Sequence, residues 1–117
     1  MDKVNQVLEL SADIRYVAVY ENKILTKGSS AGLANNSSDE SDTYEELLVN
    51  PTLLKLLGQR GDIDCGGLVY VIIRYGNFYQ LVMDIGNGHI SVAVDKEADP
   101  IEVQEMIERK IQTWKKL

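Results

Sequence analysis

The chain has 117 residues, of which 44% are hydrophobic and 26% are charged, and its formal net charge is −6 at pH 7. This length predicts one domain, residues 1–117, with a single core. The acidic balance argues against nucleic acid as a partner, because affinity for nucleic acid rests on Lys and Arg neutralising phosphates.

The single cysteine, Cys65, excludes an intramolecular disulfide. The first ten residues lack the long apolar core and the small-residue cleavage site of a signal peptide. No apolar run approaches the ~20 residues that cross a bilayer. We therefore expect a cytoplasmic protein that does not insert into membranes.

The first part of the chain predicts a short helix followed by a hairpin. Asp2–Ala12 carries Val4, Val7 and Leu8 at helical spacing. Ile14–Tyr20 and Lys23–Lys27 are strand-like, and Glu21–Asn22 between them is typical of a tight turn.

Residues 28–43, with the sequence GSSAGLANNSSDESDT, differ in character from their neighbours. They are rich in Gly, Ser and Asn and then become acidic, so they cannot bury enough apolar surface to order themselves. We expect a flexible polar loop that either stays solvated or orders on a partner. A partner there would be basic, because acidic residues cluster at Asp39, Glu40, Asp42, Glu45 and Glu46.

A leucine-rich helical segment follows the loop. Asp42 is a candidate N-cap, with Glu45 three residues later. Pro51 disfavours helix at Asn50, so the sequence predicts a turn or two from Thr43, a break, and a second helix capped by Asn50. Gly58 or Gly61 is expected to end it. The apolar surface of the segment comes from Leu47, Leu48, Leu53, Leu54, Leu56 and Leu57.

Three strand-like runs come next. Leu68–Arg74 is almost continuously apolar and β-branched, which predicts a strand buried on both faces. Phe78–Ile85 and His89–Val94 follow, separated by Gly76–Asn77 and residues 86–88, which suit tight turns. Loops this short make the three strands an antiparallel meander.

The chain closes with an amphipathic helix. Asp99 can cap it, Pro100 suits its first position and Glu102 completes a capping-box pattern. One face then carries Val103, Met106, Ile107, Lys110, Ile111 and Trp114. The element order is therefore α-β-β-α-β-β-β-α, an α+β domain with helices packed on an antiparallel sheet.

This order resembles that of roadblock/LC7-like domains, within the profilin-like group. The resemblance rests on YVAVYENKILTKG and HISVAVDKEADPIEVQEMIERKI and spans Asp13–Trp114. The segment YEELLVNPTLLKLLGQRGDIDCGG is also similar to small uncharacterised archaeal proteins of roadblock-like type. The resemblance implies strand order 2-1-5-4-3 and a dimer that scaffolds complexes and often regulates small GTPases. It supplies no catalytic residues.

With that strand order the sheet has two edges, Lys23–Lys27 and Leu68–Arg74. Lysines protect the first edge, whereas the second has no charge before Arg74 and no proline. Such an edge needs a cover, so we predict a homodimer, or a heterodimer with a similar fold. Its expected interface comprises Leu68, Val69, Tyr70, Val71, Ile72, Ile73, Arg74, Leu53, Leu54 and Leu57.

The alternatives to an interaction module rest on weaker patterns. Cys65 and His89 could form a catalytic pair, but no third group is evident to orient them. Aspartates at 62, 64, 95 and 99 could bind a hard cation, but the EF-hand spacing and its closing Glu are absent. We therefore predict no enzyme, metal or cofactor. A PAS-like or profilin-like small-molecule sensor remains open, with a pocket lined by Tyr16, Tyr20, Tyr70, Tyr75, Phe78 and Tyr79.

Overall fold

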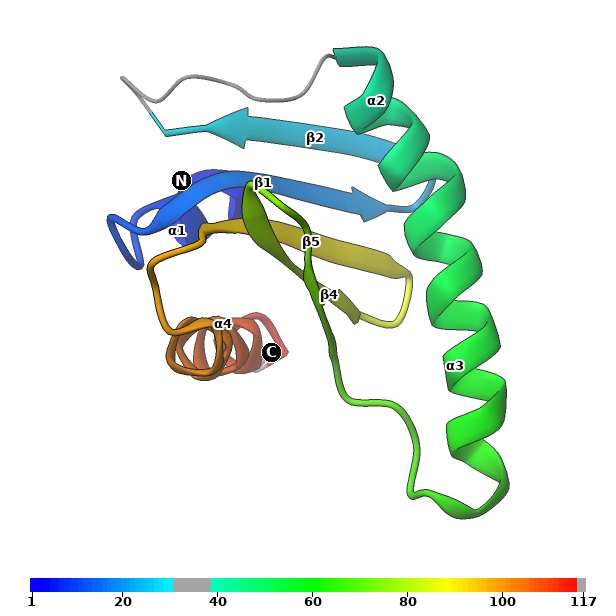
Figure 1. Ribbon diagram of the computed structural model, residues 1–117. Helices are drawn as coiled ribbons and strands as arrows, with labels where there is room; N and C mark the ends of the chain where they lie inside the picture. The colour runs from blue at the N-terminus through cyan, green and yellow to red at the C-terminus, as the bar shows by residue number, and fades with distance from the viewer. Residues whose placement is uncertain (31–38, 116–117) are drawn as a thin grey trace.

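The computed structural model describes residues 1–30 and 39–115 and shows a five-stranded antiparallel sheet (Figure 1). The strand order is β2-β1-β5-β4-β3, as predicted. In chain order the elements are α1 (Lys3–Leu8), β1 (Ile14–Glu21), β2 (Ile24–Ser29), α2 (Asp39–Tyr44), η1 (Glu45–Val49), α3 (Asn50–Asp64), β3 (Val71–Arg74), β4 (Phe78–Asp84), β5 (Gly88–Asp95) and α4 (Pro100–Trp114).

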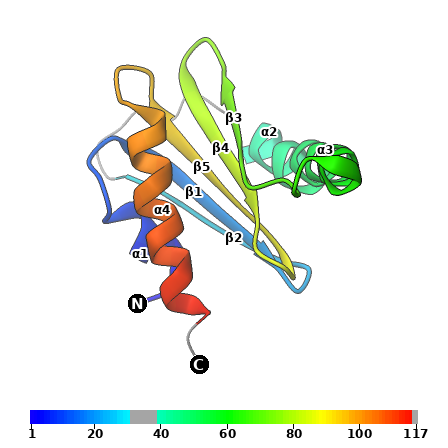
Figure 2. The same ribbon diagram turned by 90° about the horizontal axis from the view of Figure 1, so that it is seen from below.

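Helices cover both faces of the sheet. Figure 2 shows α1 and α4 on one side of the strands and α2 with α3 on the other. In the part of the chain that the structure describes, no helix is long and apolar enough to cross a bilayer.

The apolar core lies between the sheet and the pair α1 and α4. Alternate residues of β1, β4 and β5 point to this side, as the period of a strand requires. The predicted stripe of α4 meets them. The buried residues of this core are Val4, Val7, Ile14, Val17, Val19, Leu81, Met83, Ile90, Val92, Val94, Val103, Ile107 and Ile111.

The first helix and hairpin differ slightly from the prediction. Asp2 caps α1 by accepting a hydrogen bond from the Asn5 amide at 2.8 Å, but the helix ends at Leu8 rather than Ala12. The hairpin turn falls at Asn22 and Lys23, whose φ angles are 53° and 67°. These left-handed conformations suit a two-residue turn between twisted strands.

The predicted break at Pro51 is wrong. Backbone helix runs continuously from Asp39 to Asp64, and η1 is a single π-helical stretch just before the proline. The Asn50 amide donates to the Glu45 carbonyl, five residues back. This wider turn takes up the missing N–H and the ring of Pro51, which would clash with a regular helix. Asn50 is accordingly helical and buried, not an N-cap.

The predicted end of this helix is also wrong, because α3 continues past Gly58 and Gly61 to Asp64. Gly66 and Gly67 stop it, with φ angles of +80° and +90°. Gly61 serves a different purpose. A Cβ there would lie 3.0 Å from the Gly67 carbonyl carbon, so the glycine lets the returning chain pack on the helix.

The third strand is shorter and less buried than predicted. Regular strand covers only Val71–Arg74, and its apolar residues are half-buried rather than buried on both faces. The reason is its position: β3 is the last strand of the sheet and pairs only with β4 among the described strands.

Of the predicted loop at residues 28–43, residues 31–38 lie outside the described residues. Its ends belong to regular elements, because β2 extends through Ser29 and α2 begins at Asp39.

Trp114 links α4 to α1. Its ring packs against the core, its Nε1 donates to Gln6 Oε1 at 2.8 Å, and Lys3 Nζ lies 5.2 Å from the ring centroid. Trp114→Ala should lower the free energy of unfolding by about 3 kcal/mol, the lower end of the range for large aromatic truncations. Urea unfolding measures it. Gln112→Ala, exposed on the same helix, should stay within about 0.5 kcal/mol. A similarly small effect for Trp114→Ala would contradict this packing.

Candidate functional site

The second face of the sheet is unlike the apolar core. Several side chains between this face and the helices that cover it are polar and buried. Among the described residues, six polar or charged side chains are buried, and all but Gln104 belong to this layer: Glu46, Asn50, Gln80, His89 and Ser91. Buried polar groups are stable only when hydrogen-bonded, so the packing of α2, η1 and α3 on the sheet depends on specific pairings.

Glu46 is the centre of these pairings. Its fully buried carboxylate accepts from Asn50 Nδ2 at 2.9 Å and from Tyr16 Oη at 3.3 Å. His89 Nε2 lies 2.8 Å from Glu46 Oε1. An ionised carboxylate only accepts hydrogen bonds, so Nε2 carries the proton in this pair. The donors come from α3, β1 and β5. One side chain of η1 therefore connects the helical layer, which consists of α2, η1 and α3, to two strands of the sheet.

The environment of Tyr16 reflects this arrangement. Burial raises the pKa of its phenol well above the ordinary value of about 10, and the nearby carboxylates of Glu46, Asp42 and Glu45 raise the pKa further. The neutral phenol is the form that donates to Glu46.

A second polar tether joins the helical layer to the β3–β4 turn. Tyr75 Oη donates to Glu45 Oε1 at 3.2 Å. Burial raises the pKa of the Glu45 carboxyl, while the hydrogen bond from Tyr75 lowers it. Burial also raises the pKa of Tyr75.

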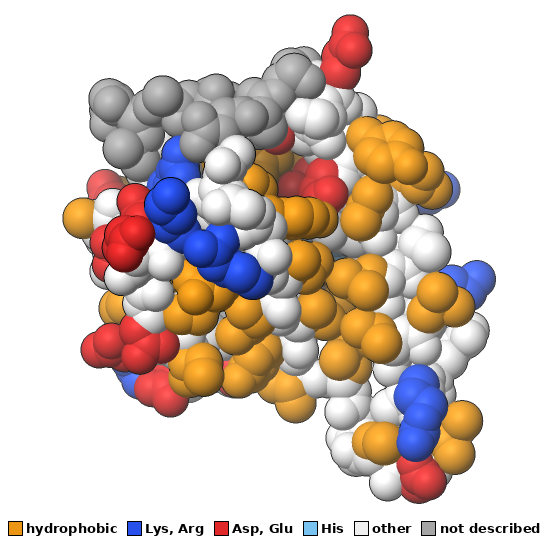
Figure 3. Space-filling model, viewed as in Figure 1, with side chains coloured by type: hydrophobic (Ala, Val, Ile, Leu, Met, Phe, Trp, Pro, Cys, Tyr) orange, Lys and Arg blue, Asp and Glu red, His pale blue; other side chains and the backbone are white. Residues whose placement is uncertain are grey.

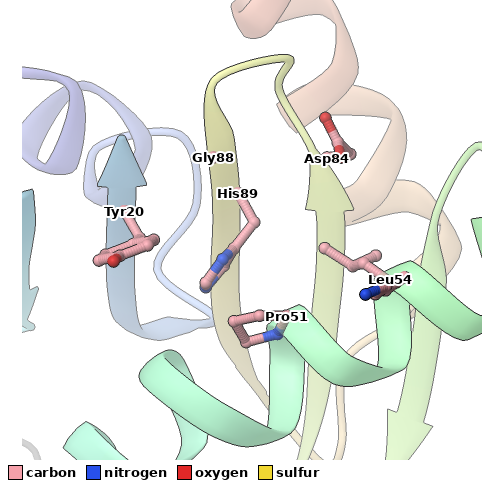
Figure 4. Close-up of a pocket in the computed structure, with 7 residues that line it drawn as sticks. Tyr20, Pro51, Leu54, Asp84, Gly88 and His89 are labelled. Carbon is pink, nitrogen blue, oxygen red and sulfur yellow. The ribbon is translucent and has the colours of Figure 1, made fainter. Parts of the chain in front are cut away.

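A pocket of about 240 Å³ opens beside the Glu46 pairings (Figure 4). Its wall comes from three strands and the start of α3, and the lining residues are Tyr20, Pro51, Leu54, Lys55, Asp84, Gly88 and His89. The His89 ring belongs to both sites, since one nitrogen pairs with Glu46 and the ring lies 5.7 Å from that of Tyr20. Gly88 permits the close approach of β5 to β1, because a Cβ there would lie 1.7 Å from the Tyr20 carbonyl oxygen.

The residues considered for catalysis or metal binding are not brought together. Cys65 is exposed and donates to Asp64 Oδ1 at 3.3 Å, whereas His89 is buried against Glu46. Arg60 Nη1 lies 2.7 Å from Asp64 and lowers the pKa of that carboxyl. Within residues 1–30 and 39–115, no three His, Cys, Asp or Glu side chains form a metal-binding group.

The predicted interface residues fall into two groups. In β3, at the sheet edge, Val71, Ile72 and Ile73 are half-buried and Arg74 is exposed, and Val69 just before the strand is 65% exposed. On α3, Leu57 is exposed and Leu53 half-buried, but Leu54 is only 8% exposed because it faces the sheet. Figure 3 shows apolar side chains gathered along α3 and the adjoining strands on this face.

Sequence reasoning missed the buried Glu46–His89 pair and placed Glu46 in an exposed acidic cluster, which is wrong. Two signals were present. Glu46 and Asn50 are four residues apart, so they share a helical face. In β5 the positions alternating with Ile90 and Val92 are His89, Ser91 and Ala93, small or polar residues that do not build an apolar layer.

Comparisons with known proteins identify the fold. No protein-family model matches the sequence, and no curated protein matches it either. A roadblock/LC7 domain from Streptomyces avermitilis superposes with a TM-score of 0.70 at 13% identity, covering 94% of this chain and 89% of that chain. An MglB structure described as having a tetrameric arrangement gives 0.68 at 10% identity, with 92% and 78% covered. MglC from Myxococcus xanthus gives 0.59 at 9% identity, with 94% and 91% covered. The chain therefore has the roadblock/LC7 fold.

The buried phenol predicts a loss of stability at high pH. Tyr16 has a raised pKa in the folded state, so its contribution is complete below the unfolded value of about 10 and is lost as pH rises above it. Between pH 10.5 and 12 the parent chain should lose up to about 1.4 kcal/mol per pH unit more than Tyr16→Phe does. Chemical unfolding at several pH values measures this slope.

Tyr44→Phe provides the matched control, because Tyr44 is 61% exposed on the same helical layer. Its alkaline slope should equal that of the parent chain. Equal slopes for the parent chain and Tyr16→Phe would contradict the assignment of Tyr16 as a buried neutral donor.

Proposed function

We propose that this chain is a non-enzymatic interaction module. In this proposal it dimerises through the outer edge of β3 and the adjoining flank of α3. The assembly then acts as a scaffold or regulator for other proteins, with a small GTPase as the partner that the roadblock resemblance implies. The observation that carries the proposal is an apolar sheet edge beside an apolar helix flank.

The edge strand supplies the first part of the argument. Among the described strands β3 pairs only with β4, so one row of its backbone groups is available to another strand. It contains no proline and no charge before Arg74. Proteins usually protect such edges with charges, prolines or bulges, or cover them. The opposite edge has Lys23 and Lys27 in or beside β2.

The helix supplies the second part. Leu53, Leu56 and Leu57 recur at spacings that place them on one flank of α3. Leu56 is 61% exposed and Leu57 is also exposed. The Glu45–Tyr75 hydrogen bond ties the N-terminal end of this helical layer to the turn after β3. In the proposal, this edge and this flank act together as one surface, on which the side chains of Val69, Leu56 and Leu57 are exposed in a single copy.

A second copy is the cover that matches this surface. A twofold axis beside β3 would pair the two β3 strands antiparallel and bring the two α3 flanks together, which is an isologous contact. The described assembly of MglB, a protein of the same fold, supports association as a use of this fold. The net charge of −6 favours a basic surface on any further partner.

The dimer is tested with Leu56→Asp and, separately, Ile72→Pro. The first places a charge on the exposed flank, and the second removes a backbone N–H that points away from β4 toward the free edge. Sedimentation equilibrium should give a dimer mass for the parent chain and a monomer mass for both variants. Ile24→Asp is the matched control, since Ile24 is 65% exposed and lies in β2 at the other edge. It should remain dimeric.

Circular dichroism of the same samples keeps loss of association separate from loss of fold. A parent chain that sediments as a monomer at high micromolar concentration would contradict the proposal, and so would a Leu56→Asp variant that stays dimeric.

The regulatory part is tested by adding the parent chain to candidate small GTPases and measuring GTP hydrolysis and nucleotide exchange. A change that the parent chain produces and monomeric Leu56→Asp does not would support regulation by the dimer. Equal rates with and without the parent chain, for every GTPase that it binds, would leave scaffolding as its only role.

A further inference from the structure

The pocket beside the Glu46 pairings has opposite charges on its two sides. Asp84 and Lys55 line it from β4 and α3, and both are exposed. No ion pair joins them or engages either with another described residue. One Asp84 oxygen accepts from the Gly86 amide at 2.6 Å, which fixes the carboxylate at the rim. The pocket therefore presents one anchored anion and one cation to whatever enters it.

Three lining residues form a row across the sheet. Tyr20 pairs with His89 between β1 and β5, and His89 pairs with Asp84 between β5 and β4. Directly opposed residues of antiparallel strands project from the same face. Tyr20, His89 and Asp84 thus point together toward α3, and Figure 4 shows the His89 ring between Tyr20 and Pro51.

His89 contributes a polar atom at the base of the pocket. The residue is 2% exposed, and its Nε2 is taken by Glu46. Among the described residues nothing hydrogen-bonds to Nδ1. Among the described residues, the side-chain polar atoms that are both inaccessible to solvent and without a hydrogen-bond partner are Asn50 Oδ1 and Gln104 Oε1. His89 Nδ1 is not among them, so it is accessible to solvent. It therefore faces the pocket, and in the neutral imidazole with its proton on Nε2 this nitrogen is a hydrogen-bond acceptor.

The rest of the lining is apolar. Pro51 and Leu54 present aliphatic surface from α3, and the Tyr20 ring faces them from β1. The volume of about 240 Å³ is below the roughly 300 Å³ at which pockets for drug-sized ligands begin. A suitable ligand is consequently small and carries a short apolar group.

We propose that this pocket binds a free amino acid or a zwitterion of that size. Its ammonium group donates to the Asp84 carboxylate and to His89 Nδ1, which are neighbours in the row. Its carboxylate meets Lys55 on the opposite wall, and its short aliphatic side chain packs on Pro51 and Leu54. Each polar lining group then has a partner of complementary chemistry.

This site goes beyond the proposed scaffold function and does not depend on it. None of its lining residues belongs to β3, so a monomer contains the whole pocket. The ligand would bridge α3 to the sheet next to the Glu46 pairings, and would thereby stabilise the attachment of the helical layer.

The test is an amide NMR titration of the full chain with free L-amino acids, led by L-leucine and L-valine. Saturable shifts should appear at residues 20, 51, 54, 55, 84, 88 and 89 and at their sequence neighbours. N-acetyl-L-leucine lacks the ammonium charge and L-leucinamide lacks the carboxylate. Each should bind at least about tenfold more weakly than L-leucine, because each loses one charged hydrogen bond.

Two variants test the assigned contacts. Asp84→Asn retains the acceptor for the Gly86 amide, and Lys55→Gln alters an exposed residue, so both should fold. Each should weaken L-leucine binding about tenfold or more. Asp62→Asn and Lys96→Gln change exposed charges that do not line the pocket, and their affinity should equal that of the parent chain.

Three results would overturn the site: no saturable shifts with any free amino acid, equal binding of L-leucine and its two derivatives, or parent-like affinity in both Asp84→Asn and Lys55→Gln. Sedimentation of the same samples reports the dimer independently, so failure of one proposal is distinguishable from failure of the other.

Discussion

The burial of one carboxylate governs how this domain is assembled. Glu46 lies between the helical layer and the sheet, where an unpaired charge would cost several kcal/mol. Donors from Tyr16, Asn50 and His89 make that position tenable. Because these donors belong to β1, α3 and β5, the position of the helix across the sheet is set by hydrogen-bond geometry rather than by apolar packing alone.

The two faces of the sheet therefore have different roles. The face under α1 and α4 holds the continuous apolar core and supplies most of the burial that stabilises the fold. The face under α3 is attached through the hydrogen bonds of Glu46 together with the buried side chain of Leu54. Several apolar side chains of α3 are exposed, among them Ile63 at 76% and Leu56 at 61%. Attachment through few polar contacts also leaves room for the pocket at His89.

Much of the fold could be predicted from the sequence, because its signals are local. Strand alternation, Gly/Asn turns and the cap at Asp99 predict β4, β5 and α4, and Asp99 Oδ1 indeed accepts from the Ile101 amide at 3.0 Å. The break expected at Pro51 was wrong because a π-helical turn absorbs the proline, and local rules do not anticipate such a turn. The inward orientation of Glu46 in this π-helical turn depends on His89, which is distant in the sequence.

The candidate site was less predictable for the same reason. The pocket joins residues of β1, α3, β4 and β5 that no sequence spacing connects. The aromatic content of the strands suggested a ligand pocket, and Tyr20 alone of that aromatic set lines it. The edge position of β3 followed from strand order, whereas its shortness and half-burial depended on its having a single neighbouring strand.

The central claim is that a second copy covers β3 and the flank of α3. Amide hydrogen exchange at two protein concentrations tests it most directly, because the edge amides are protected only in a dimer. Exchange at Ile72 and Arg74, whose N–H groups point away from β4, should slow as concentration rises, while exchange in β2, at the other edge, should not change with concentration. Equal exchange at β3 at both concentrations, or concentration-dependent protection in β2 instead, would contradict the claim.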